Sequence, residues 1–293
     1  MKIVTRKPYS NEMPQLLEMW QLIFGKTGVQ SFFNYIYNVE YAIVAEIDNK
    51  PVAMGYIVPA GDLINGSISL PCAMLYGIAT HPQYRGTGLG TAVVNELISE
   101  SYKLGFKAAV LCPSEDSLFE YYKKNTPMRD WFYTKELILD FPLAAQSSNI
   151  YYATRITPAE YLEQREKLLK NIPHIKHNLN MLQYQKKLCD ELGGGLYKIG
   201  DSCAIVEVQQ DGAAWVKELL TQNDDVGDIV TCITTVYEAS EYIIRLPAKK
   251  EDIIMNDAGT NAARRFGMFT LQDINSFDLI KSETAPWYGI AFD

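Results

Sequence analysis

The residues best able to bind a ligand are those of Arg85-Gly86-Thr87-Gly88-Leu89-Gly90, which lie between a predicted buried strand and a predicted helix. Glycine allows the backbone to adopt positive φ and to approach a ligand closely. The N–H groups at a helix start have no partner within the helix, and together with the helix dipole they favour a phosphate or pyrophosphate. Arg85 adds a full positive charge at the entrance of the loop. The segment therefore predicts an anion site built mainly from main chain.

Two common phosphate-binding loops do not fit this segment. A Walker loop ends in Gly-Lys-Ser/Thr, whereas this chain continues as Gly90-Thr91-Ala92 without a lysine. A dinucleotide-binding loop has the spacing Gly-x-Gly-x-x-Gly after the first strand of a parallel unit, whereas these glycines alternate and several expected antiparallel strands precede them. A tight turn explains one or two of the glycines, but not three at alternate positions beside an arginine.

The segment resembles motif A of the GCN5-related N-acetyltransferases (the GNAT superfamily), whose pattern is Arg/Gln-x-x-Gly-x-Gly/Ala. The likeness extends upstream through Ile78-Ala79-Thr80-His81-Pro82-Gln83-Tyr84, where the family has a strand followed by Pro-x-Tyr-Arg. Downstream it includes an expected helix at Thr91–Leu104, a strand at Ala108–Leu111 and the segment Leu118-Phe119-Glu120-Tyr121-Tyr122-Lys123-Lys124. Together these features cover most of residues 1–139.

The resemblance implies acetyl-CoA, or another acyl-CoA, as the co-substrate, and no metal. It places the pyrophosphate on the main-chain N–H groups of Arg85, Gly86, Thr87, Gly88, Leu89 and Gly90, with Thr91 completing the cofactor-binding set. It pairs the pantetheine arm with the strand end at Ile78, Ala79 and Thr80. In the family this strand parts from its neighbour and opens a slot for the thioester.

Amine attack on a thioester needs two proton transfers, because a protonated amine must lose a proton and the leaving thiolate must gain one. Tyr122 matches the tyrosine of the family's Leu/Phe-Tyr-x-Lys pattern that often protonates the thiolate, and Tyr121 is the alternative. Without a catalytic role, both tyrosines would simply be core residues of a short aromatic helix. After the tyrosine the family continues with Gly-Phe, whereas this chain has Asn125-Thr126-Pro127-Met128. No carboxylate of the strand Leu70–Ala79 stands out as a general base, which leaves water, a main-chain carbonyl or Tyr76.

We expect direct attack in a ternary complex rather than transfer through Cys112, since a cysteine that follows a buried strand is more often structural. The two-domain layout resembles that of the enhanced-intracellular-survival aminoglycoside acetyltransferases, whose C-terminal carboxylate reaches the active site; this chain lacks the length for their third domain. The apolar end Trp287–Asp293 would then pack at the domain junction and bring Asp293 to the amine as a second catalytic residue. A closing strand near Tyr288–Phe292 is the alternative.

The order of elements predicts an α/β (α+β) fold of GNAT type, with a mixed, mostly antiparallel central sheet and helices on both faces. Turn-forming residues around Phe141–Asn149 separate an N-terminal catalytic domain, 1–143, from a C-terminal GNAT-like domain, 150–293. The second half repeats the order of elements of the first but has no glycine loop. The corresponding segment, Thr221–Asp228, carries three aspartates that would repel a pyrophosphate. We therefore expect one CoA site.

Composition and spacing argue against several other classes of protein. The chain has 27 Lys and Arg against 35 Asp and Glu, a formal charge of −8, which disfavours nucleic acid. No stretch approaches the ~18 uninterrupted apolar residues of a membrane span, and the first residues are too polar for a secretory signal. His174-Ile175-Lys176-His177 has no third ligand nearby and reads as a solvated helix start rather than a metal site. Five scattered cysteines without a Cys-x-x-Cys pair fit free thiols in a reducing cytoplasm.

The expected function is therefore acetyl transfer from acetyl-CoA to a primary amine by a cytoplasmic, bacterial enzyme. The acceptor class is a small-molecule or peptide amine, and the second domain shapes the acceptor cleft or the subunit interface of a homo-oligomer. Two other classes stay open. One is a non-catalytic CoA-binding sensor or regulatory module, and the other is an interaction scaffold in which both halves are degenerate.

Overall fold

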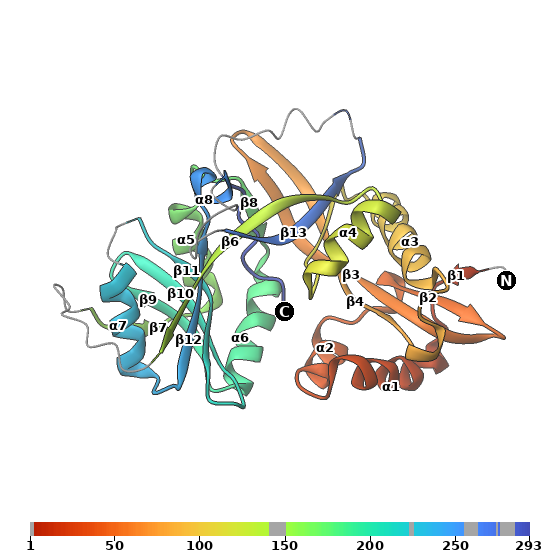
Figure 1. Ribbon diagram of the computed structural model, residues 1–293, viewed down its shortest axis with the longest axis horizontal. Helices are drawn as coiled ribbons and strands as arrows, with labels where there is room; N and C mark the ends of the chain where they lie inside the picture. Colours follow the sequence, from red (N-terminus) through yellow and green to blue (C-terminus); the bar gives the residue numbers. More distant parts are fainter. Residues whose placement is uncertain (1–2, 141–150, 223–225, 255–262, 274, 276–284) are drawn as a thin grey trace. The chain divides into compact units, whose positions relative to one another are not determined.

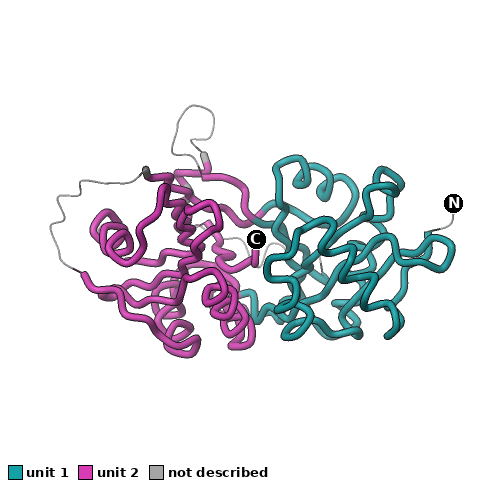
Figure 2. Tube along the Cα trace, turned by 90° about the horizontal axis from the view of Figure 1, so that it is seen from below, with its two compact units in different colours: residues 1–63, 69–130, 267–280 teal, residues 64–68, 131–266, 281–293 magenta. Residues whose placement is uncertain are grey.

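The computed structural model describes residues 3–140, 151–222, 226–254, 263–273, 275 and 285–293. The chain divides into two compact units, each built from separate stretches of sequence (Figure 2). Unit 1 consists of Met1–Leu63, Ser69–Asp130 and Gly267–Ile280, and unit 2 consists of Ile64–Ile68, Trp131–Phe266 and Lys281–Asp293.

Each unit completes its sheet with a strand from the other half of the sequence. The expected boundary around Phe141–Asn149 lies outside the described residues. The strand just before it, β6 (Arg129–Asp140), belongs to unit 2 from Trp131 onward. Conversely, the part of β13 (Arg264–Leu271) that starts at Gly267 belongs to unit 1.

Unit 1 contains the strand order β1-β2-β3-β4-β5-β13. Its remaining strands are β1 (Val4–Arg6), β2 (Ala42–Ile47), β3 (Lys50–Asn65), β4 (Ile68–Thr80) and β5 (Ala108–Leu111). The pairs β1–β2, β2–β3 and β5–β13 are antiparallel, whereas β4 and β5 are parallel. A parallel pair requires a crossover connection, and here helix α3 (Leu89–Lys103) provides it.

Helices cover both faces of the unit 1 sheet. On one face, α3 packs Val93 and Leu97 against Leu75 of β4. On the other, α1 (Met13–Phe24) and α2 (Val29–Tyr35), which lie side by side in Figure 1, bring Trp20 and Phe32 against Tyr76 of β4. Leu75 and Tyr76 reach opposite faces because successive side chains alternate along a strand. Helix α4 (Asp116–Asn125) follows β5 and adds Phe119 and Tyr122 to the core on the α3 side.

Unit 2 contains the strand order β6-β12-β11-β10-β9-β7. Its further strands are β7 (Ala153–Arg155), β8 (His174–His177), β9 (Gly195–Ile199), β10 (Ser202–Val208), β11 (Ala214–Leu220) and β12 (Glu241–Pro247). Its helices are α5 (Pro158–Leu168), α6 (Leu179–Glu191), α7 (Val226–Val236) and α8 (Lys250–Ile254). Strands β11 and β12 are parallel, and α7 lies between them in the chain, so unit 2 repeats the strand–helix–strand arrangement of β4, α3 and β5.

Two expectations for the second half are wrong. Residues 174–177 form strand β8 instead of a solvated helix start, and both histidines are buried. Each buried ring has a main-chain oxygen within hydrogen-bond distance, since His174 Nδ1 lies 2.6 Å from Ile172 O and His177 Nε2 lies 3.0 Å from Tyr288 O. The chain end forms no strand over 288–292; within the described tail only Trp287 makes a bridge, to His174.

The end of the chain is nevertheless packed. Trp287, Tyr288, Ile290 and Ala291 are all buried, as their apolar character predicts. The expected helix Asn256–Phe266 lies mostly outside the described residues, and its last residues begin β13. None of the described helices is long and apolar enough to cross a membrane.

Candidate active site

Strand β4 leaves its parallel neighbour before it ends. The pairing of β4 with β5 consists of Cys72↔Ala108, Ala73↔Ala109 and Met74↔Val110. Beyond Met74, β4 continues to Thr80, and most of its residues from Tyr76 onward are half-buried rather than buried. Main-chain groups on the β5 side of this strand end are therefore not used by that ladder, and they adjoin the start of α3.

Gly77 shapes the free part of β4. Its φ is 59°, in the left-handed region that favours glycine. A Cβ at this position would lie 2.5 Å from Trp20 Cζ3 and 2.9 Å from Tyr56 Cδ2. The indole of Trp20 therefore contacts the backbone of the strand end directly, and a side chain at position 77 would displace it.

The first turn of α3 presents N–H groups that the helix itself cannot bind. Its first hydrogen bond runs from Ala92 N to Gly88 O, at 3.0 Å, so the N–H groups of Leu89, Gly90 and Thr91 have no partner within the helix. Among the described residues, no side chain caps this end and no other main-chain oxygen accepts from these groups. Gly88 precedes the helix with a φ of 86°, which again favours glycine. This helix start is available to an anion.

The strand end, the loop and α4 meet closely at Gly90. A Cβ on Gly90 would lie 3.3 Å from Thr80 Oγ1 and 3.4 Å from Tyr121 OH. Arg85 Nε donates to Thr80 O at 3.3 Å, which holds the exposed guanidinium group beside the end of β4. Tyr121 OH lies 2.7 Å from Thr91 Oγ1. Because residue 90 is a glycine, the first amides of α3 lie close to the strand end and no side chain at this position covers them.

The cofactor residues predicted from sequence all lie at this one junction. Leu89 is buried and anchors the first turn of α3 in the core, whereas the glycine loop before it is exposed. The structure places the remaining members of the set along the end of β4, the loop and the first turn: Ile78, Ala79, Thr80, Arg85, Gly86, Thr87, Gly88, Gly90 and Thr91.

The two tyrosines of α4 differ in environment. Tyr122 is 7% exposed and packs with Phe119 in the core, and this burial raises its pKa well above the ordinary tyrosine value. Tyr121 is half-buried and its hydroxyl contacts Thr91 at the start of α3. A tyrosine with a raised pKa stays protonated at neutral pH, so Tyr122 can serve as a proton donor but not as a base.

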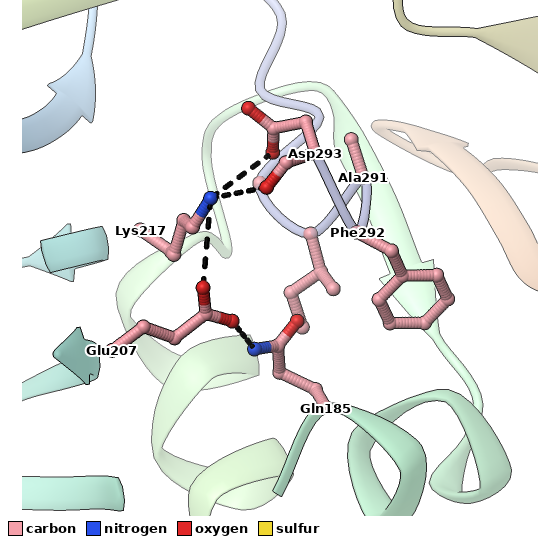
Figure 3. Close-up of a pocket in the computed structure, with 8 residues that line it drawn as sticks. Gln185, Glu207, Lys217, Ala291, Phe292 and Asp293 are labelled. Carbon is pink, nitrogen blue, oxygen red and sulfur yellow. Dashed lines mark hydrogen bonds and ion pairs between the residues drawn. The ribbon is translucent and has the colours of Figure 1, made fainter. Parts of the chain in front are cut away.

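Asp293 lies in unit 2, where two buried cations bind it. Arg245 Nη1 lies 2.6 Å from Asp293 Oδ2. The second cation is seen in Figure 3: Lys217 Nζ lies 4.0 Å from Asp293 Oδ1 and also donates to the main-chain oxygen of Asp293. The side chain of Asp293 is 26% exposed, and its partial burial opposes ionisation, but Lys217 and Arg245 outweigh this effect and lower the pKa of Asp293 to about 2. Such a carboxylate is a poor proton acceptor near neutral pH, because it binds a proton weakly.

Three kinds of residue at these sites are absent from the predictions made from the sequence. Gly77 stands alone in an apolar strand pattern, a signal that often marks a bulge or a close approach. The contact of Trp20 with Gly77 joins α1 to β4 and has no signature in the spacing of residues. Lys217 and Arg245 occupy strand positions where a charge is unusual, which was a usable signal.

One family of known proteins matches the first half of the chain. The family model for the acetyltransferase (GNAT) domain matches residues 5–125, which include β4, the glycine loop, α3, β5 and α4. No curated protein matches the sequence.

Solved structures extend the likeness beyond residues 5–125 to both units. A GCN5-related N-acetyltransferase from Anabaena variabilis is 14% identical with a TM-score of 0.69, over 93% of this chain and 74% of that one. One from Kribbella flavida is 15% identical with a TM-score of 0.65, over 93% and 71%. Eis1 from Mycobacterium abscessus is 10% identical with a TM-score of 0.62, over 96% and 76%. The expected fold, a GNAT domain followed by a second GNAT-like unit, is confirmed.

Proposed function

We propose that the protein is an acyl-CoA-dependent N-acetyltransferase that transfers an acetyl group from acetyl-CoA to a primary amine. The observation that carries the proposal is the junction of β4 and α3. There, the unpaired N–H groups of Leu89, Gly90 and Thr91 adjoin a strand end that has left its neighbour. The match of residues 5–125 to the acetyltransferase domain family supports the same function.

The residues at the junction fit the two chemical parts of CoA. A diphosphate carries oxygens that accept hydrogen bonds, and the start of α3 offers N–H donors with a favourable dipole. Arg85 adds a charged donor beside them. The pantetheine arm contains amide groups, which Ile78, Ala79 and Thr80 bind through main-chain N–H and C=O groups, in the manner of an added strand.

The reaction forms a C–N bond and breaks a C–S bond. The neutral amine nitrogen attacks the thioester carbonyl carbon, its proton passes to water or another base, and the leaving sulfur takes up a proton. We assign the donor of that second proton to Tyr122, the tyrosine that matches the family's Leu/Phe-Tyr-x-Lys pattern. Its hydroxyl is protonated at neutral pH, and its raised pKa makes it a weaker acid than an ordinary tyrosine. Tyr121 is the alternative donor, because its hydroxyl lies nearer the first turn of α3.

Attack is direct in this proposal, with amine and acetyl-CoA bound together. Cys112 is half-buried and forms no disulfide with another described cysteine, and its thiol donates to Pro113 O at 4.0 Å. Cys112→Ala should leave turnover close to that of the unchanged protein. Loss of turnover with intact CoA binding would instead indicate a covalent acetyl-cysteine intermediate.

The test is release of free thiol from acetyl-CoA in the presence of a panel of amines, which includes polyamines, aminoglycosides and peptide N-termini. Gly88→Glu should abolish CoA binding and thiol release, since it adds bulk and negative charge at the helix start. Gly105→Glu is the matched control, because Gly105 also has positive φ (96°), has no atom within 4 Å of a Cβ and lies beyond the C-terminal end of α3. Equal loss in both variants would mean that strain, not the site, is responsible.

Two results separate catalysis from its alternatives. CoA binding without thiol release for any amine would indicate a sensor or regulatory module. Retained CoA binding in Gly88→Glu would overturn the assignment of the site itself.

A further inference from the structure

The two units share one structural feature, a pair of parallel strands that separates after three paired positions. In unit 1 the last pair is Met74↔Val110. In unit 2 the pairs are Ala214↔Tyr242, Trp215↔Ile243 and Val216↔Ile244, after which β11 continues to Leu220 and β12 to Pro247. Unit 2 therefore also has a place where its two parallel strands part.

Irregular backbone marks this place in unit 2. The register between β10 and β11 shifts from Ile205↔Glu218 to Val206↔Val216, which leaves Lys217 as the extra residue of a β-bulge. A bulge turns neighbouring side chains in new directions. Lys217 and the next residue, Glu218, both make interactions with the C-terminal tail, at Asp293 and Trp287 respectively.

The side chains that follow the last parallel pair converge on one carboxylate. Lys217 is the next residue on β11 and Arg245 is the next on β12, and both contact Asp293. The cations are 7% and 2% exposed, and the ring of Trp215 lies 4.4 Å from Lys217 Nζ and 5.0 Å from Arg245 Cζ. A buried pair of cations over an aromatic ring favours an anion between them.

The other charges nearby do not replace Asp293. Lys217 Nζ lies 3.6 Å from Glu207 Oε2, and Glu207 Oε1 accepts from Gln185 Nε2 at 2.6 Å (Figure 3). On the β12 side, Arg245 and Arg264 both donate to Glu136 of β6. Counting side chains alone, three cations (Lys217, Arg245 and Arg264) face three carboxylates (Glu136, Glu207 and Asp293). Without it, one positive charge is left over in a largely buried place.

We propose that the point where β11 and β12 part is a carboxylate-binding site, and that the chain fills it with its own residue, Asp293. Further contacts hold the tail there. Trp287 Nε1 donates to Glu218 Oε2 at 2.6 Å, and Glu218 is in turn paired with Arg165. The site takes a small carboxylate when Asp293 is removed, since the two cations and the bulge remain in place.

The test is chemical rescue in the full-length protein, with Tm as the readout. Asp293→Ala should lower the Tm by several degrees, and sodium propionate should recover at least half of the loss, whereas sodium chloride at equal ionic strength should not. Propionate should have no such effect on the unchanged protein or on Lys217→Met/Asp293→Ala, which lacks one cation. Asp190→Ala is the matched control, because Asp190 forms an exposed pair with Lys186 at the same 2.6 Å separation.

Either of two results would overturn the proposal: no selective recovery by propionate, or a loss in Asp293→Ala no greater than in Asp190→Ala. If Asp293→Ala does not fold, amide hydrogen exchange of the unchanged protein decides. The amides of Trp287 and Ile290, which donate to Pro173 O and His177 Nε2, should exchange as slowly as those of β11, and exchange at the rate of an exposed segment would refute the proposal. These measurements involve neither acyl-CoA nor turnover, so that their failure leaves the function proposed for unit 1 untouched.

Discussion

Substitution of Gly77 by alanine tests whether the free end of β4 is held by direct contact with Trp20. A left-handed φ costs a residue with a Cβ about 1–2 kcal/mol. The added Cβ would also lie 2.5 Å from Trp20 Cζ3 and 2.9 Å from Tyr56 Cδ2, and such overpacking costs about 1–3 kcal/mol. Gly77→Ala should therefore destabilise the protein by about 2–5 kcal/mol in total.

Gly66→Ala is the matched control for this prediction. Gly66 has the same φ of 59° but no atom within 4 Å of a Cβ, so it should lose only about 1–2 kcal/mol. The assay is urea unfolding followed by circular dichroism. The difference between the two variants isolates the contact with the aromatic cluster.

A double-mutant cycle with Trp20→Phe sharpens the measurement. The smaller ring removes the closest atom, so Gly77→Ala should cost about 1–3 kcal/mol less in that background. Additivity within about 0.5 kcal/mol would show that the two residues are not in contact. That result, or equal losses in Gly77→Ala and Gly66→Ala, would refute the packing described for the strand end.

Three further predictions concern side chains of the two units. Tyr122→Phe should lower kcat by roughly 10²–10⁴-fold with little change in CoA affinity, whereas a similar loss in Tyr121→Phe alone would transfer the role of acid to that residue. Glu218→Gln should cost about 3–5 kcal/mol in urea unfolding, because it removes the buried carboxylate that lies 2.9 Å from Arg165 and leaves the buried Arg165 with only the more exposed Glu166, at 3.4 Å; a loss below about 1 kcal/mol would contradict the pairing. Since the folded-state pKa of Asp293 is lowered to about 2, its charge contributes stability above about pH 4. The destabilisation by Asp293→Asn, measured by urea unfolding from pH 7 to pH 2, should therefore shrink as the pH falls from 4 towards 2, and a cost independent of pH would show that the charge is not stabilising.

Local patterns predicted much of the fold. The strand Ala108–Leu111 is found as β5, and the helices expected at Pro158–Leu169 and Leu179–Leu192 are α5 and α6. In these segments the apolar period and the capping residues agree with the final packing. Thr157, for example, caps α5 together with Glu160 in a capping box. The glycine loop could also be predicted, because positions with positive φ before a helix start favour glycine.

Features that depend on distant partners could not be predicted in the same way. Two histidines and a lysine at residues 174–177 predict a solvated helix start. In the fold, His177 is buried and contacts the tail, more than a hundred residues later. The exchange of β6 and β13 between units likewise has no local signature. The need for glycine at position 77 could be predicted only if the contact with Trp20 were known.

Lys217 and Arg245 show a further limit. A lysine and an arginine within apolar strands suggest an edge or a solvated face, yet both are buried. Their burial is possible only because the bulge in β11 and the end of the tail bring Asp293 between them. The charge pattern along one strand does not contain that information.

The most direct test of the central claim is a titration of the protein with CoA, followed through the amide resonances of selectively labelled glycines. If the start of α3 binds the diphosphate, the amides of Gly86, Gly88 and Gly90 should shift together and saturate with one Kd. The amides of Gly193 and Gly212, which lie in unit 2, should not move. Saturable CoA binding that leaves the resonances of Gly86, Gly88 and Gly90 unchanged would contradict the account.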